Sequence, residues 1–109
     1  MSCNCNNNEE IIGYGSEFKV NVSMESIDGY HMGEIDFQCT FYAPGYPGIV
    51  LDKSDMVEID TDNYVAPLDT KDIGLGVLMV KYECDVPDND FGDSLRHEVI
   101  TVNTGLTIK

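Results

Sequence analysis

Apolar and polar residues alternate through much of this chain, and this alternation is what most constrains its fold. In residues 18–24, 35–41 and 78–84, apolar residues recur at every second position. A period of two puts successive side chains on opposite faces of a β-strand, whereas an amphipathic helix needs a period near 3.6. No helical period lasts beyond about two turns, so the sequence predicts strands and excludes a long helix.

Shorter apolar runs predict further strands at 49–51, 56–59, 64–68, 98–102 and 106–108. Glycine and proline mark the turns between strands, as in the 43–48 loop, and a short helical turn is expected near 71–73. Pro67 favours an edge position for its strand, because proline donates no backbone hydrogen bond. About 7–8 short strands, with turn signals about every ten residues, predict an all-β, immunoglobulin-like antiparallel β-sandwich.

The length of 109 residues is that of a single domain. We predict a flexible polar N-terminal arm over residues 1–12 and the β-sandwich domain over 13–109. The arm begins MSCNCNNNEE, a low-complexity segment that can bury little apolar surface. We therefore expect the arm to become ordered only on a partner.

Acidic residues dominate the charge. The chain has 20 Asp and Glu against 6 Lys and Arg, a net charge of −14. Such a surface repels phosphate backbones and anionic lipid, so we expect neither nucleic-acid nor membrane binding. The N-terminus lacks the basic and apolar parts of a secretory signal, so we expect synthesis in a cytoplasm and release, if any, by cell lysis.

Cys39 and Cys84 fall on the apolar faces of two predicted strands. Tyr82 precedes Cys84 by two residues, which is the spacing of an immunoglobulin tyrosine corner, where the cysteines bridge the two sheets. The chain has no tryptophan to pack against such a bridge. Without a secretory signal the thiols are expected to be reduced. We predict two buried thiols, with a disulfide as the alternative.

Two groups of residues raise the question of metal binding. Cys3 and Cys5 are separated by one residue, whereas zinc-binding cysteine pairs are usually separated by two to four, so these thiols are expected to be exposed and metal-free. The acidic loop predicted over 85–93 and the cluster at 60–62 could supply oxygen ligands to calcium. The glycine and aspartate of the loop fall in the wrong order for an EF-hand, so a solvated loop is the simpler interpretation. The weak calcium candidates are Asp85, Asp88, Asp90 and Asp93.

Catalytic patterns are missing from the sequence. No serine lies in a Gly-x-Ser-x-Gly motif, and neither His31 nor His97 is near a nucleophile in the chain. We predict no catalytic residue, no cofactor and no enzymatic activity. Arg96, the sole arginine, lies close to Glu98. It could anchor the acidic loop, bind a carboxylate of a partner, or form an ordinary surface ion pair.

The 42–48 loop combines two tyrosines with two prolines. Tyrosine is favoured at protein interfaces, and exposed loops often carry binding residues. Together with the arm, this loop supplies the predicted protein-contact residues: Cys3, Asn4, Cys5, Tyr42, Pro44, Tyr46 and Pro47.

Residues 34–108 resemble a small β-sandwich module of virion proteins from crAss-like and other Bacteroidetes phages. The resemblance is carried by short segments: IDFQCTFY at 35–42, LDKSDMV at 51–57, DTDNYVA at 60–66, DTKDIGLG at 69–76, VPDNDF at 86–91, RHEV at 96–99 and TG at 104–105. These modules are auxiliary capsid proteins or attachment domains of head fibres and tail appendages.

The resemblance implies a non-enzymatic virion structural protein, made in the host cytoplasm and located in the virion. Its partners would be a capsid or fibre protein of the same virion, with homo-oligomers also possible. A calcium-dependent ligand- or glycan-binding β-sandwich is the alternative function, because clustered aspartates can hold calcium and, through it, a sugar. The absence of tryptophan weighs against a sugar-stacking site.

Overall fold

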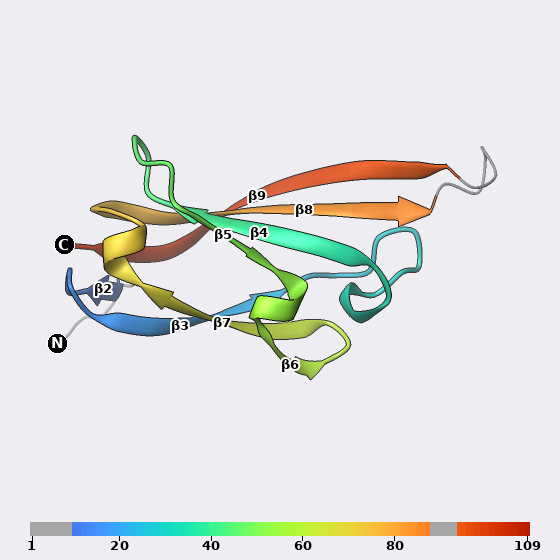
Figure 1. Cartoon of the computed structure of the whole chain (residues 1–109), viewed down its shortest axis with the longest axis horizontal. Helices are drawn as coiled ribbons and strands as arrows, with labels where there is room; N and C mark the ends of the chain where they lie inside the picture. Colours follow the sequence, from blue (N-terminus) through green and yellow to red (C-terminus); the bar gives the residue numbers. More distant parts are fainter. Residues whose placement is uncertain (1–9, 88–93) are drawn as a thin grey trace, which may run out of the picture.

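The computed structural model describes residues 10–87 and 94–109. They form two β-sheets packed face to face, as Figure 1 shows, so the predicted all-β sandwich is confirmed. The strands are β2 (Glu10–Ile12), β3 (Glu17–Ser23), β4 (Asp36–Tyr42), β5 (Ile49–Asp52), β6 (Val57–Asp60), β7 (Asn63–Asp69), β8 (Gly76–Pro87) and β9 (Leu95–Ile108). Short 3-10 turns connect some of them: η1 (Met32–Glu34), η2 (Lys53–Asp55) and η3 (Thr70–Asp72). No helix in these residues has the length and apolarity needed to cross a membrane.

The larger sheet has five strands in the order β2-β9-β8-β4-β5, and the smaller has three in the order β3-β7-β6. All neighbouring strands are antiparallel except β2, which pairs in parallel with the end of β9. Residues 10–12, assigned to the arm from the sequence, thus form β2. A strand of three residues is too short to show an alternating pattern.

The core lies between the sheets and follows the alternation in the sequence. Every second residue of β4, β7 and β8 is buried, and these side chains meet those of β3. The Phe37 ring on β4 joins the two layers. Its centroid lies 5.1 Å from that of Tyr64 in the smaller sheet and 5.2 Å from that of Tyr82 in the larger one.

β9 is one continuous strand, whereas the sequence predicted two, at 98–102 and 106–108. The pairing of β9 with β8 shifts register opposite Val77 and Met79. At this shift the Thr104 hydroxyl donates a hydrogen bond of 2.8 Å to the Leu78 carbonyl, and Gly105 has a φ of 82°. The glycine that looked like a strand end is therefore an irregularity inside a strand, which glycine tolerates.

The edge position predicted from Pro67 is wrong, because β7 is the central strand of its sheet. Pro67 lies opposite Lys19 of β3. On the other side, β6 pairs only with residues from Asn63 to Val65. Pro67 therefore lies beyond the residues that pair with β6, and its lack of an N–H group costs no hydrogen bond between β7 and β6.

Cys39 and Cys84 are both free and buried, so the disulfide alternative is wrong. They lie on β4 and β8, which are neighbours in one sheet, rather than on facing sheets. Burial raises the pKa of the Cys39 thiol to about 12. Both cysteines therefore act as small apolar core residues.

Candidate functional site

The connection between β4 and β5 is a tight, protruding loop. The Tyr46 amide donates a hydrogen bond of 3.0 Å to the Ala43 carbonyl, which closes a turn. Gly48 then brings the chain back against β4 with a φ of 73°. A Cβ atom at Gly48 would lie 2.2 Å from the Phe41 carbonyl oxygen, so the backbone approaches β4 more closely than any other residue type permits.

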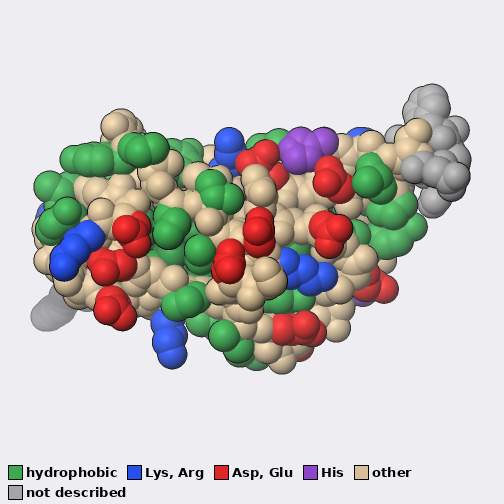
Figure 2. All heavy atoms as spheres, viewed as in Figure 1, with side chains coloured by type: hydrophobic (Ala, Val, Ile, Leu, Met, Phe, Trp, Pro, Cys, Tyr) green, Lys and Arg blue, Asp and Glu red, His purple; other side chains and the backbone are tan. Residues whose placement is uncertain are grey.

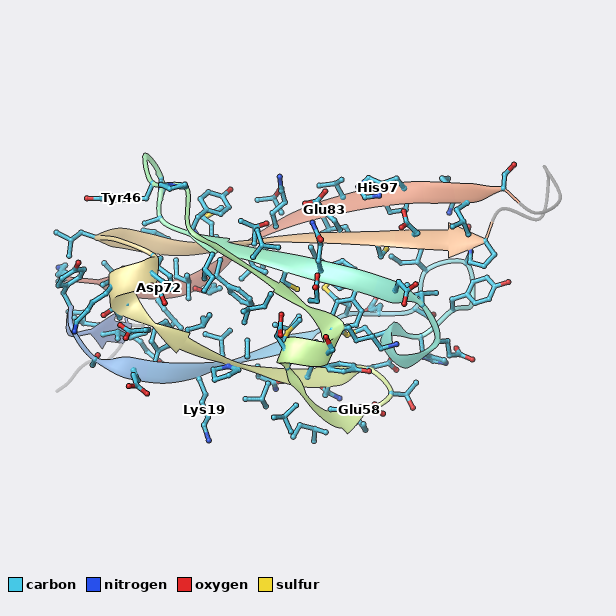
Figure 3. The ribbon with its side chains drawn as sticks, viewed as in Figure 1. Lys19, Tyr46, Glu58, Asp72, Glu83 and His97 are labelled. Carbon is cyan, nitrogen blue, oxygen red and sulfur yellow. The ribbon has the colours of Figure 1, made fainter. Side chains whose placement is uncertain are left out.

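Tyr46 is held in place by a second glycine. A Cβ atom at Gly74 would lie 2.5 Å from ring atoms of Tyr46, so the ring packs directly on the backbone between η3 and β8. Tyr46 nevertheless keeps 45% of its surface exposed. Its position on the protruding loop is shown in Figure 3. The outcome is an aromatic side chain that is both exposed and fixed.

Three other exposed apolar residues lie close to Tyr46 or to Gly74 in the chain. Pro44 and Pro47 belong to the same loop, and Leu75 follows Gly74. We call Pro44, Tyr46, Pro47 and Leu75 the loop patch. Hydrophobic side chains gather over this end of the molecule, at the upper left of Figure 2. Tyr42, also predicted as a contact residue, ends β4 and is half-buried. The predicted contacts Cys3, Asn4 and Cys5 lie outside the described residues.

A second feature is an acidic groove on the outer face of the larger sheet. It has a volume of about 610 Å³. Its charged lining residues are Asp36, Asp52, Lys53, Glu83, Asp85 and His97. The ammonium group of Lys53 is used within the fold, because its Nζ donates hydrogen bonds of 2.9 and 3.0 Å to the backbone carbonyls of Gly33 and Ile35.

His97 bridges two of these acids. Its Nδ1 lies 2.9 Å from Asp85 Oδ1, and its Nε2 lies 3.1 Å from Glu83 Oε2. Glu83 and His97 lie side by side on β8 and β9 in Figure 3. The hydrogen bonds to Asp85 and Glu83 raise the pKa of His97, and the bond to His97 lowers the pKa of Glu83. Both shifts favour the charged form of each group, because the imidazolium donates a hydrogen bond from each ring nitrogen to a carboxylate.

We expect His97 to titrate above its ordinary pKa of 6.5 and to contribute stability in a defined pH window. A raised histidine pKa gives stability below pH 6.5 that is lost as pH rises through the folded value. A lowered Glu83 pKa gives stability above pH 4.5 that is lost as pH falls through its folded value. Both contributions to stability are therefore fully present between pH 4.5 and pH 6.5.

Two-dimensional NMR of the imidazole resonances measures this pKa. Asp85→Asn and Glu83→Gln should each lower the pKa of His97, and Glu17→Gln in the smaller sheet should leave it unchanged. An unchanged His97 pKa in both groove variants would contradict the bridge.

Asp85 lies inside β8 and forms a hydrogen bond with His97, so the prediction that it begins an acidic loop is wrong. The other calcium candidates, Asp88, Asp90 and Asp93, lie outside the described residues. In the second cluster, Asp60 accepts hydrogen bonds from the Asp62 amide and the Asn63 side chain, while Asp62 bonds His31. Over residues 10–87 and 94–109, no three His, Cys, Asp or Glu side chains are arranged to hold a metal ion.

Arg96 bonds Glu98, as its spacing suggested, with 2.7 Å between Nε and Oε2. It also pairs with Asp28, a contact the sequence did not reveal. Asp28 has a φ of 50° in the turn closed by Ile27 and Tyr30. Arg96 on β9 therefore holds the segment that follows β3, through the ion pair with Asp28. Two residues so far apart in the chain leave no local sequence signal of their contact.

Comparisons of this chain with protein-family models, curated proteins and solved structures gave no match.

Proposed function

We propose that this protein is a non-enzymatic structural protein that binds the outer surface of a phage particle, as an auxiliary capsid (decoration) or head-fibre adaptor protein. The observation that carries the proposal is the loop patch. It presents exposed apolar side chains together with a tyrosine whose ring is fixed on Gly74. A contact residue that is already fixed loses little conformational entropy on binding.

The composition of the loop patch suits a protein partner. Tyrosine is enriched among the residues that dominate interface energies, because it combines a large apolar area with one hydroxyl group. Proline keeps the flanking backbone stiff before and after binding. The patch is small, so one copy alone gives a limited contact area. Many copies on a regular particle surface would each use the same contact.

The charge distribution supports an outer rather than an inner location. The chain carries a net charge of −14, and the outer face of the larger sheet holds the acidic groove. Packaged DNA repels such a surface, whereas an exterior protein gains solubility from it. The assignment to phage particles in particular rests on the resemblance of residues 34–108 to virion modules.

Density-gradient fractionation of a lysate from the native source, probed with an antibody to this chain, tests the proposal. We expect the chain to travel with particles of virus size and to stay with them after a second gradient. Recovery of the chain entirely among small soluble proteins would overturn the virion assignment.

A further inference from the structure

The free edges of the two sheets differ in how well they are protected. An edge strand exposes unpaired backbone groups that can pair with another chain, and natural proteins shorten, bend or charge such edges. β5 and β6 are four residues each. β6 also carries Glu58 and Asp60 and shifts register against β7. β3 carries Glu17 and Lys19. These three edges therefore resist strand addition.

The edge of β9 is longer than these, and its charged residues, Arg96, His97 and Glu98, all lie before Val99. Over the described residues, β9 pairs with β8 on one side, while β2 covers only Leu106 to Ile108 on the other. Among the described residues nothing pairs with the second side from Leu95 to Asn103, and this stretch contains neither proline nor glycine. Leu95, Val99 and Val102 are exposed, Val99 with 51% of its surface. In Figure 1, the first part of β9 runs along the upper border of the molecule, at the right.

The charge of this edge is also unusual for the chain. Between Leu95 and Asn103 the ionisable residues are Arg96, His97 and Glu98, and Arg96 pairs with Glu98. Whether His97 is neutral or protonated, the stretch therefore carries no net negative charge, in a chain with a net charge of −14. A second copy can approach this edge without meeting excess negative charge on the strand itself.

We propose that two copies of this chain pair antiparallel along the open edge of β9, which joins their larger sheets into one continuous sheet. A two-fold axis at Val99 brings the two Val99 side chains together. The same alignment sets Leu95 opposite Asn103 and His97 opposite Thr101, so no like charges oppose each other. The free backbone groups of each strand are then paired by the other.

This pairing goes beyond the proposed function and uses a different surface. β9 and β5 lie toward opposite sides of the larger sheet, and the loop patch adjoins β5. A dimer therefore leaves the loop patch available for another partner. A failure of either proposal leaves the other intact.

Sedimentation velocity of the purified full chain, from 5 to 500 µM, tests the dimer. Each copy is strongly acidic, so the like charges outside the edge oppose association and salt screens them. We expect a dimer whose association strengthens by several-fold between 50 and 500 mM NaCl. A monomer at all concentrations and both salt levels would overturn the proposal.

Val99→Lys places two lysines side by side at the centre of the pairing. We expect it to weaken the dimer at least tenfold. The control is Val57→Lys on β6, where the valine is 59% exposed. Both variants reduce the net negative charge equally, so general repulsion falls in both, and only the β9 variant should lose dimer. Equal dimerisation of the two variants would place the interface elsewhere and refute the pairing.

Amide hydrogen exchange of the wild-type chain gives a second test that requires no variant. Raising the concentration from 5 to 500 µM should slow the exchange of amides between residues 95 and 103, with β6 as the internal reference. Exchange that is independent of concentration in a sample that sediments as a dimer would exclude β9 as the interface.

Discussion

Phe37→Ala is expected to lower the free energy of unfolding by about 3–5 kcal/mol, because the substitution removes a buried ring and leaves a cavity. Phe37 lies at the centre of the core and contacts both sheets. It meets the Tyr64 ring edge-on at an interplanar angle of 80° and stacks on Tyr82 at 29°. Losing these ring pairs adds to the cost of the cavity. Urea unfolding monitored by circular dichroism measures the effect.

Two variants bracket this expectation. Phe37→Leu retains most of the apolar volume and should cost clearly less than the alanine variant. Val57→Ala, at an exposed position, should change stability by less than about 0.5 kcal/mol. If Phe37→Ala lowered the free energy of unfolding no more than Val57→Ala does, Phe37 would not be packed between the two sheets as described.

Gly48→Ala is expected to be the most damaging glycine substitution in the loop, at about 2–5 kcal/mol, which combines the left-handed backbone with overpacking. The new Cβ atom would lie 2.2 Å from the Phe41 carbonyl oxygen and 2.6 Å from Tyr42 Cβ. Because Phe41 is paired with Ile49 of β5, the backbone cannot yield without breaking that pairing. Thermal and urea unfolding give the loss.

Gly45→Ala is the matched control in the same loop. Gly45 also has a positive φ, of 91°, but nothing lies within 4 Å of a Cβ atom there. Its substitution should cost only about 1–2 kcal/mol for the backbone conformation. Equal losses for the two variants would mean that the close approach of Gly48 to β4 is not real.

The strands with a clear period of two could be predicted from the sequence. Each of β3, β4 and β8 buries alternate residues, and that local pattern needs no knowledge of the partner strand. The helical turn near 71–73 was also predicted and corresponds to η3. By contrast, β2 owes its existence to pairing with the end of β9, a contact between the two ends of the described chain.

The candidate site was predicted only in part. Tyrosine and proline marked the 42–48 loop as a contact surface, and that interpretation remains a prediction. The packing of Tyr46 on Gly74 was not visible, because it depends on how two loops meet in space. The same holds for the bridge from His97 to Glu83 and Asp85, which forms because β8 and β9 are neighbours. Cross-strand contacts of this kind follow from register, which the sequence pattern alone did not specify.

The central claim, attachment through the loop patch, is tested most directly by binding of the purified chain to particles of the native source that have been stripped of it. We predict saturable binding of the wild type and, for Tyr46→Ala, a loss of about 30-fold or more, typical of a residue that dominates an interface. Tyr14→Ala, which removes another exposed tyrosine, is the matched control and should bind like the wild type. All three proteins should have similar melting temperatures. Tyr46→Ala binding as tightly as the wild type, or no binding by the wild type, would contradict the account.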